Sequence, residues 1–268
     1  MRPLSHSSAK PSLYNKESET YDMFNHENSK IINGTIEKIL RKYKKKTVLD
    51  LTCGTGSQVF WLADKGYEII GADINAKMLK IAKNKGKQEK IEVKFIKCDM
   101  RTASIGKFGA VITIFNAVGH LTKNDFEKAM RAIYNNLHND GLYIFDIFNA
   151  RYFQKDNNIT KLTIDWQKKD GKIKSRIIQY STINDTGVLS SFTIELLQKS
   201  SESLKTTKHT NTLQIYSSDE LKEMLHRNGF KVIRKCAIDG SRFDEDETDR
   251  IFIVAKKQEL DVHPHKQN

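Results

Sequence analysis

Residues 48–56, Val-Leu-Asp-Leu-Thr-Cys-Gly-Thr-Gly, constrain the fold more than any other segment of the chain. An apolar strand ends near the carboxylate of Asp50, and a Gly-x-Gly turn, Gly54 to Gly56, then opens into a helix. Glycines let the backbone approach a ligand closely, and a helix N-terminus presents unpaired N–H groups. A dinucleotide site favours a third glycine, so that the helix can close over the pyrophosphate, but Val59 holds that position. The segment therefore favours a ligand with a cationic centre and an ammonium group.

Apolar strands alternate with amphipathic helices between residues 47 and 147, after an amphipathic helix over residues 28–41. Such alternation is typical of a parallel sheet that helices cover on both faces. We therefore predict an α/β fold with a Rossmann-like sheet. The predicted strands are 47–51, 68–71, 91–96, 110–115 and 142–147, and the predicted helices are 57–65, 75–85 and 124–137.

The pattern changes after Phe148. Four β-rich runs without helical periodicity, separated by turn residues, predict an antiparallel sheet inserted after the fifth strand. Helix and strand signals then resume, with a helix from Ser217 or Ser218 to Asn228. The predicted divisions are a polar, loosely ordered segment 1–20, a core 21–150, the insertion 151–215, a return to the core sheet 216–257 and a polar tail 258–268. The insertion is expected to wall a substrate pocket or to form a dimer interface.

Composition excludes several classes of protein. Hydrophobic residues make up 38% of the 268, enough for a packed core. No run approaches the length of a membrane span, and the polar N-terminus lacks the apolar stretch of a signal peptide, so we expect a cytoplasmic protein. Cys53, Cys98 and Cys236 are widely separated and have no histidine at ligand spacing, which favours reduced thiols and no metal site.

The net charge of +12 is compatible with nucleic-acid binding or an anionic substrate. Divided into coarse segments, however, the charge is dispersed, and only Lys42 to Lys46 forms a tight basic run. That run falls at a predicted helix end, where cations favour the helix dipole. We therefore interpret the charge mainly as a compositional bias toward lysine.

The segment Asp-Leu-Thr-Cys-Gly-Thr-Gly, residues 50–56, resembles the glycine-rich motif of class I S-adenosylmethionine (SAM)-dependent methyltransferases. Further positions follow the family's order along the chain. Asp73 matches the acidic residue that binds the ribose hydroxyls, Met78 the apolar residue against adenine, and Asp99-Met100 the segment that reads the adenine edge. The resemblance implies SAM as cofactor, S-adenosylhomocysteine (SAH) as product and a SAM-binding core over residues 21–150.

By this resemblance the cofactor-binding set is Tyr21, Asp50, Cys53, Gly54, Thr55, Gly56, Asp73, Ile74, Met78, Asp99, Met100, Phe115 and Asn116. Other interpretations stay open for single members. In these alternatives Asp50 caps the following turn and Asp73 caps the following helix. Met78 is then an ordinary core residue, and Tyr21 anchors the N-terminal helix instead of folding over the sulfonium.

Residues 115–120, Phe-Asn-Ala-Val-Gly-His, follow the fourth strand, so they lie where the methyl acceptor must bind. They lack the Asn/Asp-Pro-Pro-Tyr of many nucleic-acid amino methyltransferases and resemble the amino-sugar N,N-dimethyltransferases. That resemblance implies catalytic positions for Tyr21 and for Arg250, which would face the substrate pocket. His120 is a candidate proton acceptor for a substrate ammonium, unless it is a structural loop histidine.

Three functional hypotheses follow. The first is methylation of a small-molecule acceptor, with an amine such as an amino sugar ahead of a hydroxyl. The second is a tRNA or rRNA methyltransferase that uses the basic charge. The third is a non-catalytic SAM-binding interaction protein. A homodimer is compatible with all three, and no membrane partner is expected.

Overall fold

The computed structural model describes residues 5–15, 18, 21–155, 161–170, 173–200 and 202–259, without the side chains of 23–26, 161–163, 166, 170 and 173. Most of the predicted tail 258–268 therefore lies outside the described residues. The N-terminal half contains α1 (Tyr21–Lys42), β1 (Thr47–Asp50), α2 (Ser57–Asp64), β2 (Glu68–Asp73), α3 (Ala76–Glu89), β3 (Lys94–Lys97), β4 (Phe108–Thr113), the 3₁₀ helix η1 (Ala117–His120), α4 (Lys123–Asn135) and β5 (Leu137–Phe148). After it come α5 (Ala150–Gln154), β6 (Lys161–Asp170), β7 (Ile173–Ile183), β8 (Val188–Lys199), β9 (Lys205–Gln214), α6 (Ser218–Arg227), β10 (Phe230–Cys236) and β11 (Arg250–Lys257).

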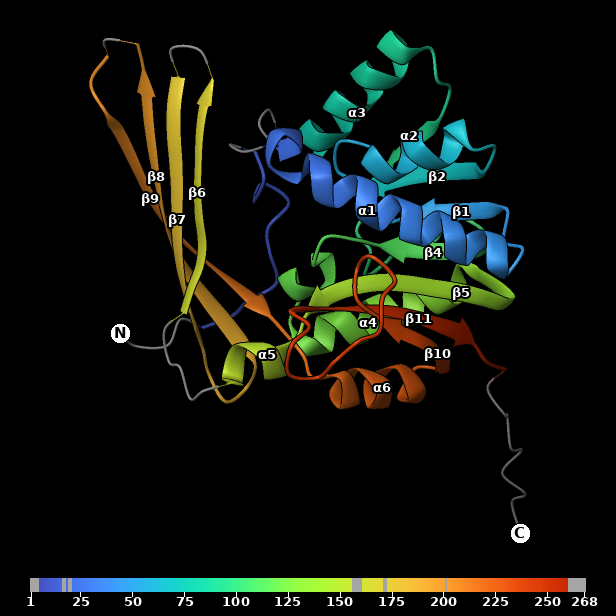
Figure 1. The fold of residues 1–268 in the computed structure, drawn as a ribbon. Helices are drawn as coiled ribbons and strands as arrows, with labels where there is room; N and C mark the ends of the chain where they lie inside the picture. Colours follow the sequence, from blue (N-terminus) through green and yellow to red (C-terminus); the bar gives the residue numbers. More distant parts are fainter. Residues whose placement is uncertain are drawn as a thin grey trace.

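The core is a seven-stranded sheet of order β10-β11-β5-β4-β1-β2-β3 (Figure 1). Strands β1 to β5 run parallel, and β11 is antiparallel to β5. The strand order reverses between β1 and β4, because the chain proceeds outward from β1 to β3 and then returns to β4. Ligands of open α/β sheets bind at the carboxyl ends of strands beside such a switch point. The predicted α/β class with a largely parallel sheet is confirmed.

Helices cover both faces of this sheet. Alternate strand residues point to opposite faces, and Ile144 packs with Ile36 of α1 and Leu62 of α2, whereas Phe145 packs with Phe126 of α4. Because both faces of the sheet are buried, the strand sequences are nearly continuous runs of apolar residues. Within the described part of the chain, none of the helices is long and apolar enough to cross a bilayer.

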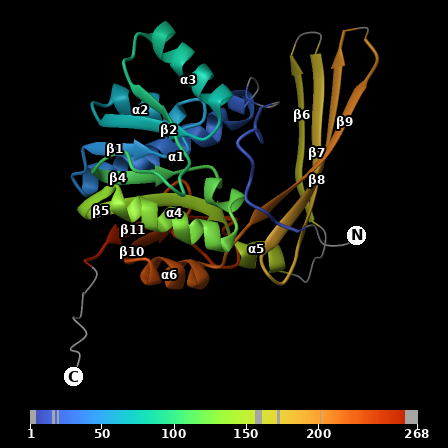
Figure 2. The ribbon, with the colours of Figure 1, turned by 180° about the vertical axis from the view of Figure 1, so that it is seen from behind.

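The insertion is a four-stranded antiparallel sheet of order β6-β7-β8-β9 that stands beside the core in both views (Figures 1 and 2). Its base is fixed by a small buried cluster that includes Phe153 of α5 and Leu189 of β8. The predicted antiparallel second sheet is confirmed.

The N-terminal segment differs from its prediction. Over residues 5–15 it runs between the core and the inserted sheet (Figure 1) and bonds to the core. Ala9 N–H donates to the His120 carbonyl at 2.8 Å, and Ser8 Oγ donates to Asp125 at 2.6 Å. The expectation of loose order is therefore wrong for these residues. Helix α1 also begins seven residues earlier than predicted, at Tyr21.

Candidate active site

The Gly-x-Gly turn joins β1 to α2 in a conformation that requires glycine. Gly54 and Gly56 have φ values of 51° and 94°, a region that side chains with a Cβ rarely adopt. A Cβ built on Gly54 meets no protein atom within 4 Å, so it would occupy the space above the turn. No side chain caps the start of α2. The turn thus leaves open space above Gly54 that a ligand can enter.

Asp73 ties the end of β2 to this turn. Its carboxylate accepts hydrogen bonds from Gly54 N–H at 2.9 Å and Asn75 N–H at 2.7 Å. Burial raises the pKa of Asp73 despite these bonds. The cap of α3 is Asn75, whose side chain accepts from Lys77 N–H and Met78 N–H. The Asp73 carboxylate is therefore not needed as the side-chain cap of α3, and it lines the cavity.

Asp50 lies beneath the turn and is fully buried. Its Oδ1 accepts from Thr52 N–H at 3.1 Å, and its Oδ2 has no hydrogen-bond partner among the described residues. Burial, with a smaller contribution from the charge of Asp73, raises the pKa of Asp50 to about 8. An unpaired buried carboxylate is costly, so the protonated form of Asp50 is favoured in the ligand-free protein.

The segment after β3 closes the cavity on another side. Asp99 accepts two bonds from the Arg101 side chain through Oδ2, at 2.6 and 3.0 Å, and one from Arg101 N–H at 2.9 Å. Burial opposes ionisation of Asp99, but the bonds from Arg101 outweigh it and lower the pKa. The Asp99 carboxylate is thus already occupied, which leaves the backbone of this segment to contact a ligand.

The turn after β4 is held from below by a buried ion pair. Phe115 and Asn116 have φ values of 65° and 56°, and their N–H groups donate to the Asp146 carboxylate at 2.6 and 3.3 Å. Arg250 pairs with the same carboxylate, and its guanidinium lies 5.7 Å from the centre of the Phe115 ring and 5.6 Å from that of Phe148.

Arg250, which the resemblance predicts to face the substrate pocket, is not among the residues that line the cavity, so its contact with a substrate stays a prediction. The physical reason for its position is Asp146, which the sequence analysis did not consider: its fully buried charge needs a cationic partner. We assign Arg250 a supporting role beneath Phe115.

His120, at the end of η1, is enclosed by the N-terminal segment. Its Nε2 shares a hydrogen bond of 2.5 Å with the hydroxyl of Tyr14, and the two rings meet edge to face. Burial, with a smaller contribution from His6, lowers the pKa of His120 to about 4. The imidazole is therefore neutral at physiological pH.

Tyr14 is a site residue that the sequence analysis missed. The segment that carries it is bonded both to the cavity wall and to the inserted sheet: Asn75 Nδ2 donates to Asn15 at 3.2 Å, and His6 bonds to Thr212 of the insertion at 2.9 Å. Polar residues without periodicity gave no signal for this segment. The available hint was three aromatic or apolar residues, Leu13, Tyr14 and Tyr21, close together ahead of the core.

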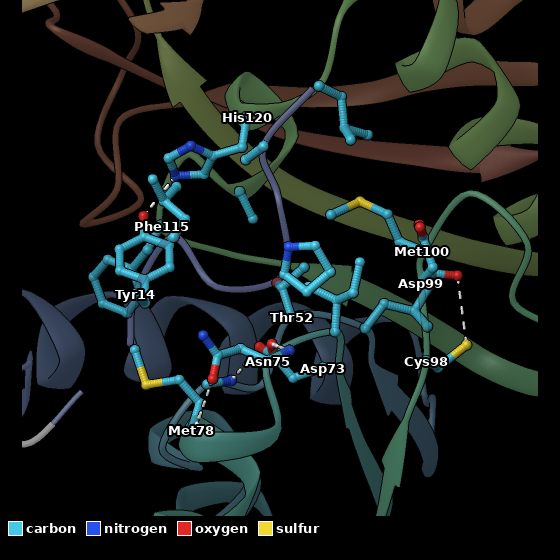
Figure 3. Close-up of a pocket in the computed structure, with 18 of the residues that line it drawn as sticks. Tyr14, Thr52, Asp73, Asn75, Met78, Cys98, Asp99, Met100, Phe115 and His120 are labelled. Carbon is cyan, nitrogen blue, oxygen red and sulfur yellow. Dashed lines mark hydrogen bonds between the residues drawn. The ribbon is translucent and has the colours of Figure 1, made fainter. Parts of the chain in front are cut away.

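Most predicted site residues meet around one cavity with about 800 Å³ of empty space, part of it open to solvent. Those that line it are Tyr21, Gly54, Asp73, Ile74, Met78, Asp99, Met100, Phe115 and His120. Figure 3 shows two ends, with Tyr14, Phe115 and His120 at one and Cys98, Asp99 and Met100 at the other. We call the part around Gly54, Asp73 and Asp99, where the sequence predicts cofactor contacts, the cofactor end, and the part around Tyr14, Phe115 and His120, where it predicts the methyl acceptor, the acceptor end.

The remaining predicted residues lie behind the cavity wall. Besides Asp50 and Arg250, they are Cys53, Thr55, Gly56 and Asn116. Cys53 is buried among the apolar residues on the α1–α3 side of the sheet. Thr55 Oγ1 donates to Asp22 of α1 at 2.5 Å, and Asp22 also pairs with Lys85 of α3, so these contacts fix α1 above the turn. Metal-binding clusters are absent from the described residues.

Comparison with known proteins identifies the domain that carries this cavity. Residues 48–141 match the family model described as a methyltransferase domain. A protein of Bacillus subtilis (strain 168), YqeM, is 27% identical over 232 residues, which are 82% of this chain and 87% of that protein. It is named a methyltransferase, although its activity is not established.

Solved structures share the architecture. A SAM-dependent methyltransferase from Clostridium acetobutylicum superposes with a TM-score of 0.75 at 19% identity, covering 91% of this chain and 99% of that one. SAM-bound CalS10, an amino pentose methyltransferase from Micromonospora echinaspora, superposes with a TM-score of 0.68 at 18% identity, covering 84% and 90%. At these identities the likeness concerns the fold, and the sequence match of the domain concerns the family. The chain is a SAM-dependent methyltransferase.

Proposed function

We propose that the protein transfers the methyl group of SAM to the nitrogen of a small-molecule amine, with an amino sugar as the favoured class. The observation that carries the proposal is the partial enclosure of the cavity by residues of the N-terminal segment, namely Ala9, Lys10, Pro11, Leu13 and Tyr14. A partly enclosed cavity of this kind suits a small acceptor better than a nucleic-acid strand, which would need an open groove.

The cofactor end has the features that SAM requires. The open space above Gly54 admits a ligand where a Cβ would project, Asp73 offers paired acceptor oxygens for a vicinal diol, and the unpartnered Oδ2 of Asp50 lies below the same turn. Met78 and Met100 supply apolar contacts for a flat base. When bound, SAM supplies a methyl group on a sulfonium, and that positive charge favours the ionised forms of the buried Asp50 and Asp73.

At the acceptor end, the protein's part is to position an uncharged amine. Moving a proton from an alkylammonium to an imidazole with a pKa of about 4 is unfavourable, because each pKa unit costs about 1.4 kcal/mol. We therefore propose that the amine enters as the free base and that the Tyr14–His120 pair orients its lone pair. Orientation alone contributes up to roughly 7–11 kcal/mol in ideal intramolecular models.

The base of the inserted sheet supports the acceptor end. A Cβ on Gly119 would lie 3.0 Å from the Gln214 carbonyl of β9 and 2.9 Å from Ile147, so η1 packs tightly against both. We propose that the insertion acts on catalysis through this contact. The likeness to CalS10, which is described as an amino pentose methyltransferase, supports an amino-sugar acceptor.

The test is a methylation assay with purified protein and SAM. The acceptor panel contains amino deoxysugars, free and nucleotide-linked, their hydroxyl counterparts, simple alkylamines and bulk tRNA. SAH formation measures turnover, and mass spectrometry locates the added methyl group. Turnover on an amino sugar but not on its hydroxyl counterpart is expected. Turnover on tRNA alone would overturn the proposal in favour of an RNA methyltransferase.

A further inference from the structure

A second concave surface lies on the opposite side of α3 from the active-site cavity. It is a groove between α3 and the edge strand β3, and we call it the lysine groove. Its charged lining consists of Lys80, Lys83, Lys87, Lys90, Lys94 and Lys97, with Glu92 as the acidic member. All six lysines are exposed, and none forms an ion pair with another residue that the structure describes.

The charge here is far denser than coarse division of the sequence indicates. Residues 76–97 contain eight lysines and two glutamates, a net charge of +6 out of the chain's +12. Lys80, Lys83 and Lys87 recur at helical spacing and form one stripe along α3. Folding then places Lys94 and Lys97 of β3 on the facing wall. The dispersed charge of the sequence is thus partly gathered into one surface.

Protection of the exposed sheet edge at β3 does not account for the lysines on both walls of the groove. Lysines on an edge strand discourage sheet-to-sheet aggregation, which explains Lys94 and Lys97. It does not explain a stripe of lysines on the neighbouring helix, where mutual repulsion lowers stability. Like charges gathered on two walls of one groove indicate a polyanionic partner.

The groove is separate from the methyl-transfer cavity. With about 3.6 residues per turn, Lys80, Lys83 and Lys87 point away from Met78, which lines the cavity from the same helix. The two surfaces share none of their lining residues. Occupation of the groove therefore leaves the cavity accessible, and the inference is independent of the proposed small-molecule acceptor.

We propose that the lysine groove binds the phosphate backbone of a nucleic-acid strand. Lys80 and Lys87 are seven residues apart, roughly 10 Å along the helix axis, which matches about three phosphates at 3.4 Å of axial rise per strand. A groove admits a narrow strand between its walls, whereas a flat bilayer reaches only the rim. Among the described residues, none of the exposed large apolar side chains lies in the groove to anchor it in lipid.

The recognition is expected to be independent of base sequence. The aromatic residue of the lining is Phe95, which packs against Phe60 in the core and is therefore not a free stacking platform. Lysine contacts to phosphates position a strand without reading it. Binding should accordingly weaken with salt, with a slope that counts the phosphates neutralised.

The experiment measures fluorescence anisotropy of short labelled RNA and DNA strands of mixed sequence with the full chain, over a series of salt concentrations. The test variant is Lys83→Glu/Lys87→Glu. The matched control is Lys38→Glu/Lys42→Glu, which makes the same charge change at the same spacing on the exposed side of α1. The test variant should bind at least tenfold more weakly, with the salt slope reduced by about 2, and the control should bind nearly as the unmodified protein does.

Two results would overturn the proposal. Equal weakening by both variants would mean that net charge, not the groove, attracts the strand. Binding to vesicles of equal parts phosphatidylserine and phosphatidylcholine, lost in the test variant while neither RNA nor DNA binds, would assign the groove to membranes. SAH binding and melting temperature check that each variant is folded. Methylation of the bound strand would refute the small-molecule acceptor while leaving the groove assignment intact.

Discussion

The two ends of the active-site cavity are built in different ways. The cofactor end comes from three neighbouring parallel strands, and its main contacts join the ends of adjacent strands and their turns, such as Asp73 with Gly54, 19 positions away, and with Asn75. The acceptor end joins distant parts of the chain: Tyr14 meets His120, and Arg250 supports the turn after β4 through Asp146.

This difference has a functional consequence. A parallel sheet fixes the cofactor end through backbone geometry, so it tolerates change elsewhere in the chain. The acceptor end depends on side chains contributed by the N-terminal segment, η1 and β11, so single substitutions there should alter turnover without displacing the cofactor. The following predictions test this division.

The largest effect is expected from Arg250→Met, because it leaves the fully buried Asp146 without its cationic partner. Removing one partner of a buried ion pair typically costs about 3–5 kcal/mol. Chemical denaturation should show a loss of that size. Arg250→Met/Asp146→Asn should recover part of it, since the amide oxygen still accepts from Phe115 N–H.

The same variant tests the division between the two ends. If Arg250→Met remains folded at low temperature, SAH affinity should change little while methyl transfer falls. A loss of SAH affinity equal to the loss of turnover would show that the two ends are not separable.

The second effect concerns Asp73→Ala at the cofactor end. SAH at 100 times its dissociation constant should stabilise the unmodified protein by about 2.7 kcal/mol. Asp73→Ala should abolish this stabilisation, because the ribose hydroxyls lose their acceptor and the Gly54 turn loses a bond. Asp73→Asn should lose only part of it, and the exposed Asp64→Ala serves as the matched control. A thermal shift unchanged in Asp73→Ala would contradict the assignment of the cofactor end.

The cofactor end was predictable from the sequence for a physical reason. A strand, a turn with positive φ and a helix start are local features, and glycine and carboxylate at fixed spacing record them directly. Gly54 followed from this local pattern, whereas Asp73 and Met78 were assigned by the resemblance to SAM-dependent methyltransferases; all three line the cavity. The parallel sheet and the antiparallel insertion followed in the same way from periodicity.

The acceptor end was less predictable because its contacts are long-range. Nothing in the sequence near Tyr14 indicates that it meets a residue 106 positions away. The resemblance to a family places Arg250 at the pocket, and the ion pair with Asp146 was not predicted because the pairing of β11 with β5 is not encoded in either strand alone. The lysine groove was not predicted for the same reason, because its two walls lie on different elements, α3 and β3.

The third effect is a change in pH dependence at Asp50. The pKa of this carboxyl is about 8 in the folded protein and 3.8 in the unfolded reference, so the native state binds the proton more tightly. The contribution of this proton to the free energy of unfolding is therefore complete below pH 3.8, and it is lost as the pH rises from there through 8. Asp50→Asn should remove this loss and raise the free energy of unfolding of the ligand-free protein above pH 8 by about 1–3 kcal/mol.

The same substitution should weaken SAM binding, because a cationic ligand favours ionisation of Asp50 and an asparagine cannot ionise. Thermal denaturation across pH, with and without SAH, measures both effects. A variant that is less stable than the unmodified protein at high pH would show that Asp50 is satisfied in a way that the folded structure does not display.

The smallest effect is expected at the acceptor end, from Tyr14→Phe and His120→Asn. If the pair orients an amine that arrives uncharged, each substitution should lower kcat roughly tenfold, equivalent to about 1.4 kcal/mol, and leave SAH affinity unchanged. The pKa of about 4 keeps the imidazole neutral above that pH, so both variants should retain the acid limb of kcat/KM that the substrate amine imposes. The exposed His138→Asn is the matched control. A deficit that shrinks as the pH rises, in His120→Asn but not in Tyr14→Phe, would instead identify His120 as the proton acceptor, because free amine would then replace the missing base.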